Sequence, residues 1–390
     1  MDEYLVLRDP RAGGTSRGGG GGPRTGPGAV PSEPRIEVEV TDARGRAELL
    51  ADPQVAAVTR AMPTRLISPV STPDEPADTP PWGLAAVGAD RSRYDGSDVV
   101  VAVLDTGVDS THAAFAGLSL VEQDFSGSGN GDVVGHGTHC AGTIFGQDVA
   151  GARIGVARGV RSALIGKVLG DDGSGSSTMA FQGVQWAVRH GAQVISMSLG
   201  LDFPGLVVRL VEAGWPVDLA TSNALEAYRG NLRMFDALMG LIRANEAFGA
   251  GAVLVAAAGN ESRREVDPRY EIAASLPAAA DGVISVGALG PAEGGYVVAP
   301  FSNTMPAVSA PGVGIESSKT GGDLITMSGT SMACPHVAGV AALWWQAVRE
   351  RRELATPRYV AAKLLATARA DVFAPGTDPT ARGAGMITAP

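Results

Sequence analysis

Residues 328–339 read SGTSMACPHVAG, and they lead into a helix-forming run at 337–348. Gly329 lets the backbone turn tightly just before the hydroxyl of Ser331. Unpaired N–H groups and the positive dipole end at a helix start favour a developing anion, so this position suits a nucleophile. Pro335 is predicted to lie in the first turn, where no N–H is missed. Taken alone, however, a Ser before a helix is more often a cap than a nucleophile.

Two further stretches carry the side chains that a nucleophile needs. Residues 99–104 (VVVAVL) form a continuous apolar run, as in a strand buried on both faces, and they lead to Asp105 at its carboxyl end. Residues 135–143 (GHGTHCAGT) are predicted as a helix start of small residues that carries the imidazole of His136. Asp, His and Ser in this chain order form one of the known orders of a catalytic triad.

The motifs around these residues resemble those of the subtilisin-like serine proteases, the subtilases. They are DTG at 105–107, HGTH at 136–139 and GTSMA at 329–333, and VLVAAAGN at 253–260 is a fourth that ends in an amide side chain. Four motifs in the right order form a specific signal. The resemblance runs from about Trp82 to the C-terminus and is closest in motif detail to the subtilisin and proteinase K branch.

The resemblance implies a serine endopeptidase. Ser331 would attack the scissile carbonyl, His136 would accept its proton through Nε2, and Asp105 would hold the Nδ1–H tautomer. Asn260 and the backbone N–H of Ser331 would form the oxyanion hole. Cys140 lies one helical turn beyond His136, as in the proteinase K branch, and is predicted to sit beneath the imidazole. A peptide-binding pseudoprotease or scaffold is the alternative, and the complete set of four polar side chains argues against it.

The resemblance also implies where an extended peptide binds, through backbone pairing that reads little sequence. The implied contacts are Gly173, Ser174 and Gly175 on one side, Ser198, Leu199 and Gly200 on the other, and Ala257, Ala258 and Gly259 around the primary pocket. Such a pocket is wide and apolar, which favours a large apolar side chain before the scissile bond. Glu261 at its rim favours a basic residue instead, and both alternatives stay open.

Strands alternate with helices beyond residue 81, which predicts an α/β fold with a parallel central sheet and helices on both faces. The active site of such a sheet lies at the carboxyl ends of its strands, where Asp105 and Asn260 fall. Residues 201–230 exceed the family pattern and form an apparent insertion, which is partly helical around 219–228 and precedes a separate helix at 231–248. The insertion follows a strand expected to bind substrate, so it is either a surface decoration or a lid that narrows access.

Residues 1–80 are predicted as a prodomain-like segment ahead of a peptidase domain at 81–390. Alternating patterns predict strands at 3–8, 35–40 and 55–67 and a helix at 44–50. A glycine-rich stretch, 13–27, is predicted as a flexible linker, and 68–81 as a second linker. The module resembles a degenerate version of the family's inhibitory prodomain, so we expect a zymogen in which this segment is an intramolecular inhibitor.

Composition limits the other classes of function. A chain of 390 residues with 45% hydrophobic and 18% charged residues accommodates one large domain and a small module. The net charge of −10 disfavours nucleic acid as a partner, and two cysteines make no disulfide framework. Without a recognisable signal peptide or membrane-spanning run, we expect a cytoplasmic protein with no membrane partner, or a secreted one if the natural chain begins further upstream. No cofactor is predicted; calcium is common in subtilases, but residues 113–115 and 147–153 do not match its usual ligands.

Overall fold

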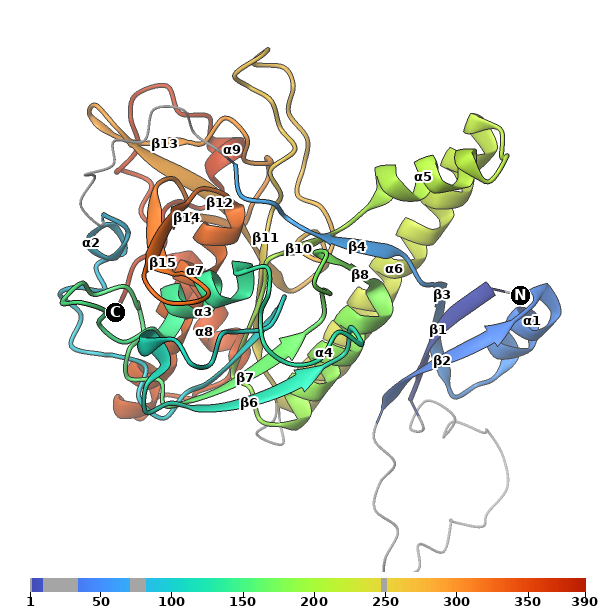
Figure 1. Cartoon of the computed structure of the whole chain (residues 1–390), viewed down its shortest axis with the longest axis horizontal. Coiled ribbons are helices and arrows are strands. Elements are labelled where there is room, and N and C mark those ends of the chain that lie inside the picture. The colour runs from blue at the N-terminus through green and yellow to red at the C-terminus, as the bar shows by residue number, and fades with distance from the viewer. Residues whose placement is uncertain (1, 10–33, 71–81, 247–250) are drawn as a thin grey trace, which may run out of the picture.

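The computed structural model describes residues 2–9, 34–70, 82–246 and 251–390. Its main body is a central sheet with strand order β13-β12-β11-β9-β5-β7-β6, in which β14 also pairs with β12 (Figure 1). All neighbouring strands are parallel except β13, which runs antiparallel to β12. The strands are β5 (Val100–Asp105), β6 (Ser119–Asp124), β7 (Ser162–Lys167), β9 (Val194–Met197), β11 (Val253–Ala257), β12 (Val283–Ala292), β13 (Gly295–Val298) and β14 (Val308–Pro311). The predicted α/β class with a parallel sheet is therefore confirmed.

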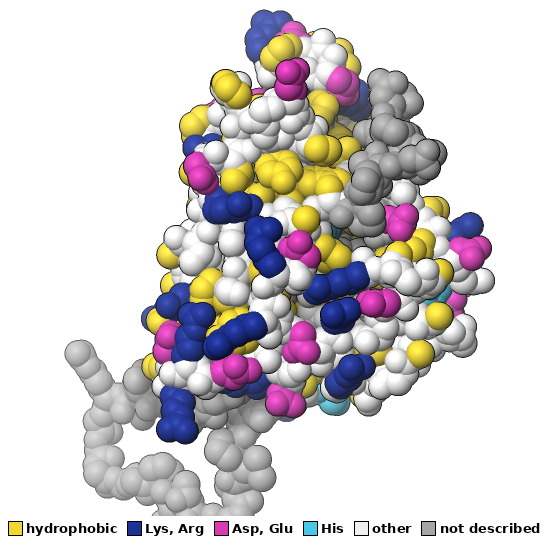
Figure 2. Space-filling model, turned by 90° about the vertical axis from the view of Figure 1, so that its left-hand side faces the viewer, with side chains coloured by type: hydrophobic (Ala, Val, Ile, Leu, Met, Phe, Trp, Pro, Cys, Tyr) yellow, Lys and Arg dark blue, Asp and Glu magenta, His cyan; other side chains and the backbone are white. Residues whose placement is uncertain are grey.

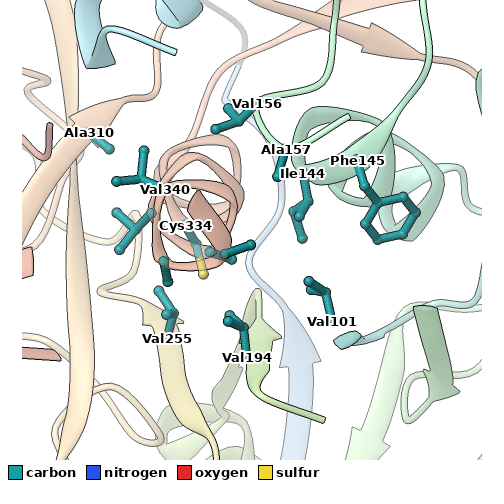
Figure 3. Packing of buried hydrophobic residues seen from close by; sticks show 14 of the residues in the cluster. Val101, Ile144, Phe145, Val156, Ala157, Val194, Val255, Ala310, Cys334 and Val340 are labelled. Carbon is teal, nitrogen blue, oxygen red and sulfur yellow. The ribbon is translucent and has the colours of Figure 1, made fainter. Parts of the chain in front are cut away.

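The two faces of the sheet are covered by different helices. Side chains alternate along a strand, so Val101 and Val103 join one apolar cluster and Ala102 and Leu104 join the other. The first cluster includes helices α3 (His136–Phe145) and α7 (Thr330–Glu350), and the second includes α4 (Ser177–Arg189) and α6 (Val217–Asn245). Figure 3 shows Val101, Val194 and Val255 of three neighbouring strands on one side of α7, with Ile144 of α3 beside it. This packing holds the starts of α3 and α7 near the carboxyl ends of the central strands.

Helix α7 begins earlier than the sequence predicts. It starts at Thr330, so Ser331 is its second residue and Pro335 lies inside the helix rather than in its first turn. Proline has no N–H to bond the carbonyl four residues earlier, which is that of Ser331. That carbonyl accepts from Ser198 Oγ at 3.3 Å and from Cys140 Sγ at 3.4 Å instead. The interior proline is therefore tolerated because two other side chains satisfy the freed acceptor.

The N-terminal segment forms a separate antiparallel sheet, with order β2-β1-β3. Its elements are β1 (Asp2–Arg8), β2 (Arg35–Thr41), α1 (Ala43–Ala51) and β3 (Val55–Arg60). The predicted strand 55–67 is instead two strands, because Pro63 cannot donate within a ladder and begins a new strand, β4 (Pro63–Leu66). The glycine-rich stretch 13–27 and most of the predicted linker 68–81 lie outside the described residues.

Strand β4 leaves the N-terminal sheet and crosses the main body. It pairs antiparallel with β10 (Leu199–Leu201) on one side and with β8 (Ser174–Ser176) on the other. In Figure 1, β4 continues from β3 across the main body, beside β8 and β10.

Residues 201–230 form a helical hairpin that projects beyond the sheet (Figure 1). Its first helix is α5 (Phe203–Glu212), none of whose residues is buried. Its second helix is the N-terminal part of α6, which runs unbroken from Val217 to Asn245. The prediction of a separate helix beginning at Asn231 is therefore wrong, because α6 continues through Gly230, and a single glycine weakens a helix without ending it. The hairpin exposes several large apolar side chains, namely Val208, Val211, Trp215, Val217 and Leu219.

Shorter elements complete the described chain: α2 (Gly83–Val87), a 3₁₀ turn at Ala113–Phe115, β15 (Ile315–Ser318), β16 (Leu324–Met327), α8 (Pro357–Ala366) and α9 (Pro379–Arg382). On the face shown in Figure 2, acidic and basic side chains are interspersed and no basic patch gathers. Among the described helices, none is both long enough and apolar enough to span a bilayer.

Candidate active site

Asp105 and His136 form a buried acid–imidazole pair. Asp105 is the last residue of β5, and His136 is the first residue of α3. Nδ1 of His136 lies 2.8 Å from Oδ1 of Asp105, and the N–H of Thr106 donates to the same oxygen at 2.8 Å. This geometry places the proton on Nδ1 and leaves Nε2 as the basic nitrogen. Nε2 is buried and has no hydrogen-bond partner within the described part of the chain.

A second buried carboxylate, Asp132, holds the backbone segments on either side of this pair in place. It accepts from Thr106 Oγ1 at 2.9 Å, from the N–H of Gly135 at 2.8 Å, and from the N–H and hydroxyl of Thr138 at 2.9 and 2.7 Å. It therefore ties the loop after β5 to the start of α3. Sequence reasoning missed Asp132, because no local pattern marks a carboxylate whose partners lie 26 residues upstream and only a few residues downstream.

Ser331 stands at the start of α7 with its side chain buried. Its hydroxyl donates to the carbonyl oxygen of Ile67 at 3.0 Å. Because it is the second helical residue, its N–H has no acceptor within the helix and is available to an oxyanion. Its carbonyl, which Pro335 cannot bond because proline has no N–H, accepts hydrogen bonds from the side chains of Ser198 and Cys140.

The amide of Asn260 is oriented by Thr330, the residue before Ser331. Its Oδ1 accepts from both the N–H and the hydroxyl of Thr330, at 2.9 and 2.8 Å. Nδ2 is thereby turned toward the groove, where it donates to the carbonyl of Ser68 at 3.0 Å. Asn260 follows β11 as Asp105 ends β5, so the two side chains reach the same edge of the sheet, as the sequence predicts.

The groove beside Ser331 is occupied by the chain's own strand β4. Arg65 lies opposite Ser174 on one side and opposite Gly200 on the other. The N–H of Leu66 donates to Gly173 O at 2.9 Å, and further on the N–H of Val70 donates to Ser328 O at 2.8 Å. Gly175 and Leu199 also pair with β4 residues. The residues expected to hold an extended peptide therefore flank an extended segment of this protein.

Ile67, whose carbonyl accepts from Ser331, has an apolar side chain. It is 3% exposed, and a Cβ added to Gly200 would stand 3.7 Å from its Cγ1. Ala257 and Gly259 are buried at the end of β11, close in sequence to Asn260. Glu261 lies at the rim, and its carboxylate contacts Arg65 rather than the neighbour of the nucleophile.

Cys140 lies where the sequence predicts, with Sγ 3.8 Å from His136 Nδ1. Burial, together with the negative charge of Asp105, holds the pKa of the Cys140 thiol well above its usual value. Asp105, His136 and Cys140 are also the only three potential metal ligands that cluster within 4.8 Å in the described residues. The cluster coincides with the acid–imidazole pair, so we assign it no separate role.

Two other histidines are structural. His139 contacts the carbonyl of Ile315 through Nε2 at 3.0 Å, and burial lowers its pKa to about 3. His336 contacts the carbonyl of Met332 through Nδ1 at 2.8 Å, and burial lowers its pKa to about 4. Both rings therefore stay neutral in the folded protein near pH 7.

Comparison with known proteins agrees with this geometry. Residues 96–385 match the model of the subtilase family. The chain is 32% identical to a thermostable alkaline protease of Halalkalibacterium halodurans over 275 residues, which cover 68% of this chain and 63% of the relative. It is 34% identical to subtilisin DY of Bacillus licheniformis over 275 residues, covering 68% and 85%. A subtilisin-like protease of Coccidioides posadasii is 33% identical over 276 residues, covering 68% and 58%.

The match thus spans only about three fifths of the length of two of these relatives, at 63% and 58%. Within this chain it takes in the acid–imidazole pair, the amide and the serine at the helix start. The chain belongs to the subtilase family.

Proposed function

We propose that the protein is a serine endopeptidase that hydrolyses peptide bonds through Asp105, His136 and Ser331. The observation that carries this proposal is the position of the chain's own segment around Ile67. An extended peptide lies across the site, the nucleophile's hydroxyl bonds one of its carbonyls at 3.0 Å, and the amide of Asn260 bonds the next at 3.0 Å. The relatives named above are proteases, which supports the same activity for this chain.

The reaction follows from these groups. Ser331 Oγ adds to the carbonyl carbon as its proton passes to Nε2 of His136, and Asp105 stabilises the imidazolium through Nδ1–H. The N–H of Ser331 and Nδ2 of Asn260 stabilise the negative oxygen of the tetrahedral intermediate. His136 then gives the proton to the leaving amine, which leaves an acyl group on Ser331. Water, activated by the same imidazole, hydrolyses that ester and restores the serine.

Residues 2–70 are the intramolecular inhibitor in this proposal. Strand β4 lies in the groove and pairs with β10 on one side and β8 on the other. While β4 stays there, a substrate strand has no free strand edge to pair with. The sheet that presents β4 is anchored to two helices of the main body. Thr178 at the start of α4 donates to Glu3 at 3.0 Å, and Asn231 of α6 donates to the carbonyl of Arg60 at 2.9 Å. These contacts favour a zymogen that must cut or release its N-terminal segment.

The test is the intact mass of purified wild type beside a Ser331→Ala variant, each with and without a fluorophosphonate. We expect the wild type alone to take up the label and to lose roughly its first 67–80 residues, since Ser331 contacts the carbonyl of Ile67 and the family resemblance begins at Trp82. Labelling of a full-length chain would remove the cleaved-inhibitor part and keep the endopeptidase. If wild type freed of residues 1–80 takes up no label, the protein is a peptide-binding pseudoprotease instead.

A further inference from the structure

Arg65 of β4 is held between two carboxylates on opposite parts of the groove rim. Its Nη2 lies 3.4 Å from Oε1 of Glu261, and its Nη1 lies 3.5 Å from Oδ1 of Asp202. Glu261 follows the amide of the candidate oxyanion hole, and Asp202 follows β10 directly. The guanidinium therefore bridges two elements that are 59 residues apart in the sequence (261 − 202).

Both carboxylates are held in place by neutral partners. Oε2 of Glu261 accepts from Nδ2 of Asn303 at 2.8 Å, and Oδ1 of Asp202 accepts from the N–H of Gly205 at 3.0 Å at the start of α5. Among the described residues, neither carboxylate forms an ion pair with any cation other than Arg65. Once β4 leaves the groove, two oriented negative charges at its rim have lost their counter-ion.

The position of this pair relative to the reacting bond follows from the register of β4. Ile67 follows β4 directly, so Arg65 lies two residues before it along the extended segment. The carbonyl of Ile67 is the one that the Ser331 hydroxyl contacts. Thr64, the residue before Arg65, is 2% exposed, whereas the Arg65 side chain is 46% exposed.

We propose that Asp202 and Glu261 form a subsite for a basic side chain, which selects substrates with Arg or Lys two residues before the residue whose carbonyl Ser331 attacks. The inference rests on the proposed endopeptidase function and names its substrate class: a protein or peptide with a basic residue at this position and an aliphatic residue next to the cut. Glu261 thus binds the substrate side chain at the position of Arg65, the third residue before the scissile bond. The pocket beside Ser331 binds the apolar side chain at the position of Ile67, next to that bond.

The experiment uses peptides Ac-Pro-Thr-X-Leu-Ile-aminomethylcoumarin, which copy residues 63–67 and fix the bond that is cut. The enzyme is the wild-type protein as purified, with its active sites counted by fluorophosphonate. X is Arg, Lys, Gln or Glu. Two partly exposed ion pairs give an expected kcat/KM about 2- to 30-fold higher for Arg than for Gln, and lower still for Glu. The Arg:Gln ratio should shrink as salt is raised, because salt screens exposed charges.

The matched variants are Asp202→Asn and Glu261→Gln, singly and together. Asn still caps a helix, and the amide oxygen of Gln still accepts from Asn303, so each variant removes the charge and keeps the shape. We expect the ratio of kcat/KM for the Arg peptide over the Gln peptide to fall to about one in the double variant.

Three results overturn the inference. An Arg:Gln ratio near one, with the Gln peptide well cleaved, refutes the subsite and leaves the endopeptidase standing. A preference for Arg that survives in the double variant, or that appears when the variable residue replaces Thr instead, refutes the assigned residues or register. If no peptide is cleaved, and Ser331 takes up no fluorophosphonate even in protein freed of residues 1–80, the proposed function fails and the inference fails with it.

Discussion

Replacing Asn231 with Ala should loosen the N-terminal segment from the main body without disturbing the reacting groups. Asn231 is fully buried on α6, and its Nδ2 donates to the carbonyl of Arg60 at 2.9 Å and to Thr59 Oγ1 at 3.3 Å. Both acceptors belong to β3, which only Ala61 and Met62 separate from β4, the strand in the groove. Within the described part of the chain, its side chain donates to Thr59, Arg60 and Ala227, and to no residue of the candidate active site.

The magnitude follows from the bonds that are lost. Each neutral hydrogen bond contributes about 0.5–1.5 kcal/mol net, so two contribute about 1–3 kcal/mol to keeping the segment docked. Since about 1.4 kcal/mol is tenfold in an equilibrium constant, the open population should rise by about 5- to 140-fold. The Asn231→Ala helix should remain formed, because Ala has the higher helix propensity.

The assay is amide hydrogen exchange on a Ser331→Ala background, which cannot cut itself in this proposal. We expect protection to fall by the stated factor in peptides covering 55–70 and in their groove partners, and to stay unchanged in β5, β9 and β11. Ser222→Ala, an exposed change on the same helix, is the control and should change nothing. Unchanged exchange at 62–70, or an equal loss across the central sheet, would refute the idea that Asn231 latches the segment.

The remaining predictions concern the active site and acid stability. Stoichiometric mercuric chloride should abolish peptide hydrolysis by the wild type and spare a Cys140→Ala variant, while iodoacetamide at pH 7 leaves this thiol unmodified because burial raises its pKa. Full mercury loading without loss of activity contradicts its placement under the imidazole. Thr330→Val removes one of the two donors that orient Asn260 and should lower kcat by about 2- to 12-fold with KM little changed; an unchanged kcat argues that the N–H alone suffices. Burial lowers the pKa of His139 to about 3 and of His336 to about 4, so below pH ~6.5 the unfolded chain binds more protons than the folded one. The free energy of unfolding in urea should therefore fall by roughly 2–4 kcal/mol from pH 7 to pH 5, and a flat profile contradicts the neutral assignment.

The positions of the proposed reacting groups were predictable from sequence, because each group lies at the start or end of a helix or strand that the local pattern marks. An apolar run ends at Asp105, a glycine precedes the helix of His136, and another precedes the helix of Ser331. Such boundaries depend on only a few neighbouring residues. A parallel sheet then brings the carboxyl ends of its strands to one edge, irrespective of the length and conformation of the loops. The structure joins His136 to Asp105 at 2.8 Å as the sequence predicts, whereas the Ser331 hydroxyl donates to the carbonyl of Ile67 and not to His136.

The occupant of the groove was not predictable in the same way. Pro63 marks a break between β3 and β4, but nothing from Val55 to Ile67 indicates which sheet each strand joins. The pairing of Arg65 with Ser174 and Gly200 joins residues more than a hundred positions apart, which no local pattern encodes. The prediction that Pro335 lies in the first helical turn was wrong for a related reason. The donors that satisfy the Ser331 carbonyl, and so allow a proline inside the helix, come from residues distant in sequence.

Residues 201–230 contact both the strand in the groove and the sheet that presents it. Asp202 faces Arg65, while Asn223 accepts from Arg60 at 3.2 Å and Glu226 pairs with Arg46 at 2.9 Å. A surface decoration would contact neither, so these contacts favour the interpretation of the segment as part of the groove rim. Exposed ion pairs of this kind contribute only about 0–1 kcal/mol each. Their main effect is therefore on which peptide sequence the groove prefers, and not on its overall affinity for a peptide. The same hairpin that helps to seat the chain's own basic residue would then help to choose the basic residue of a substrate.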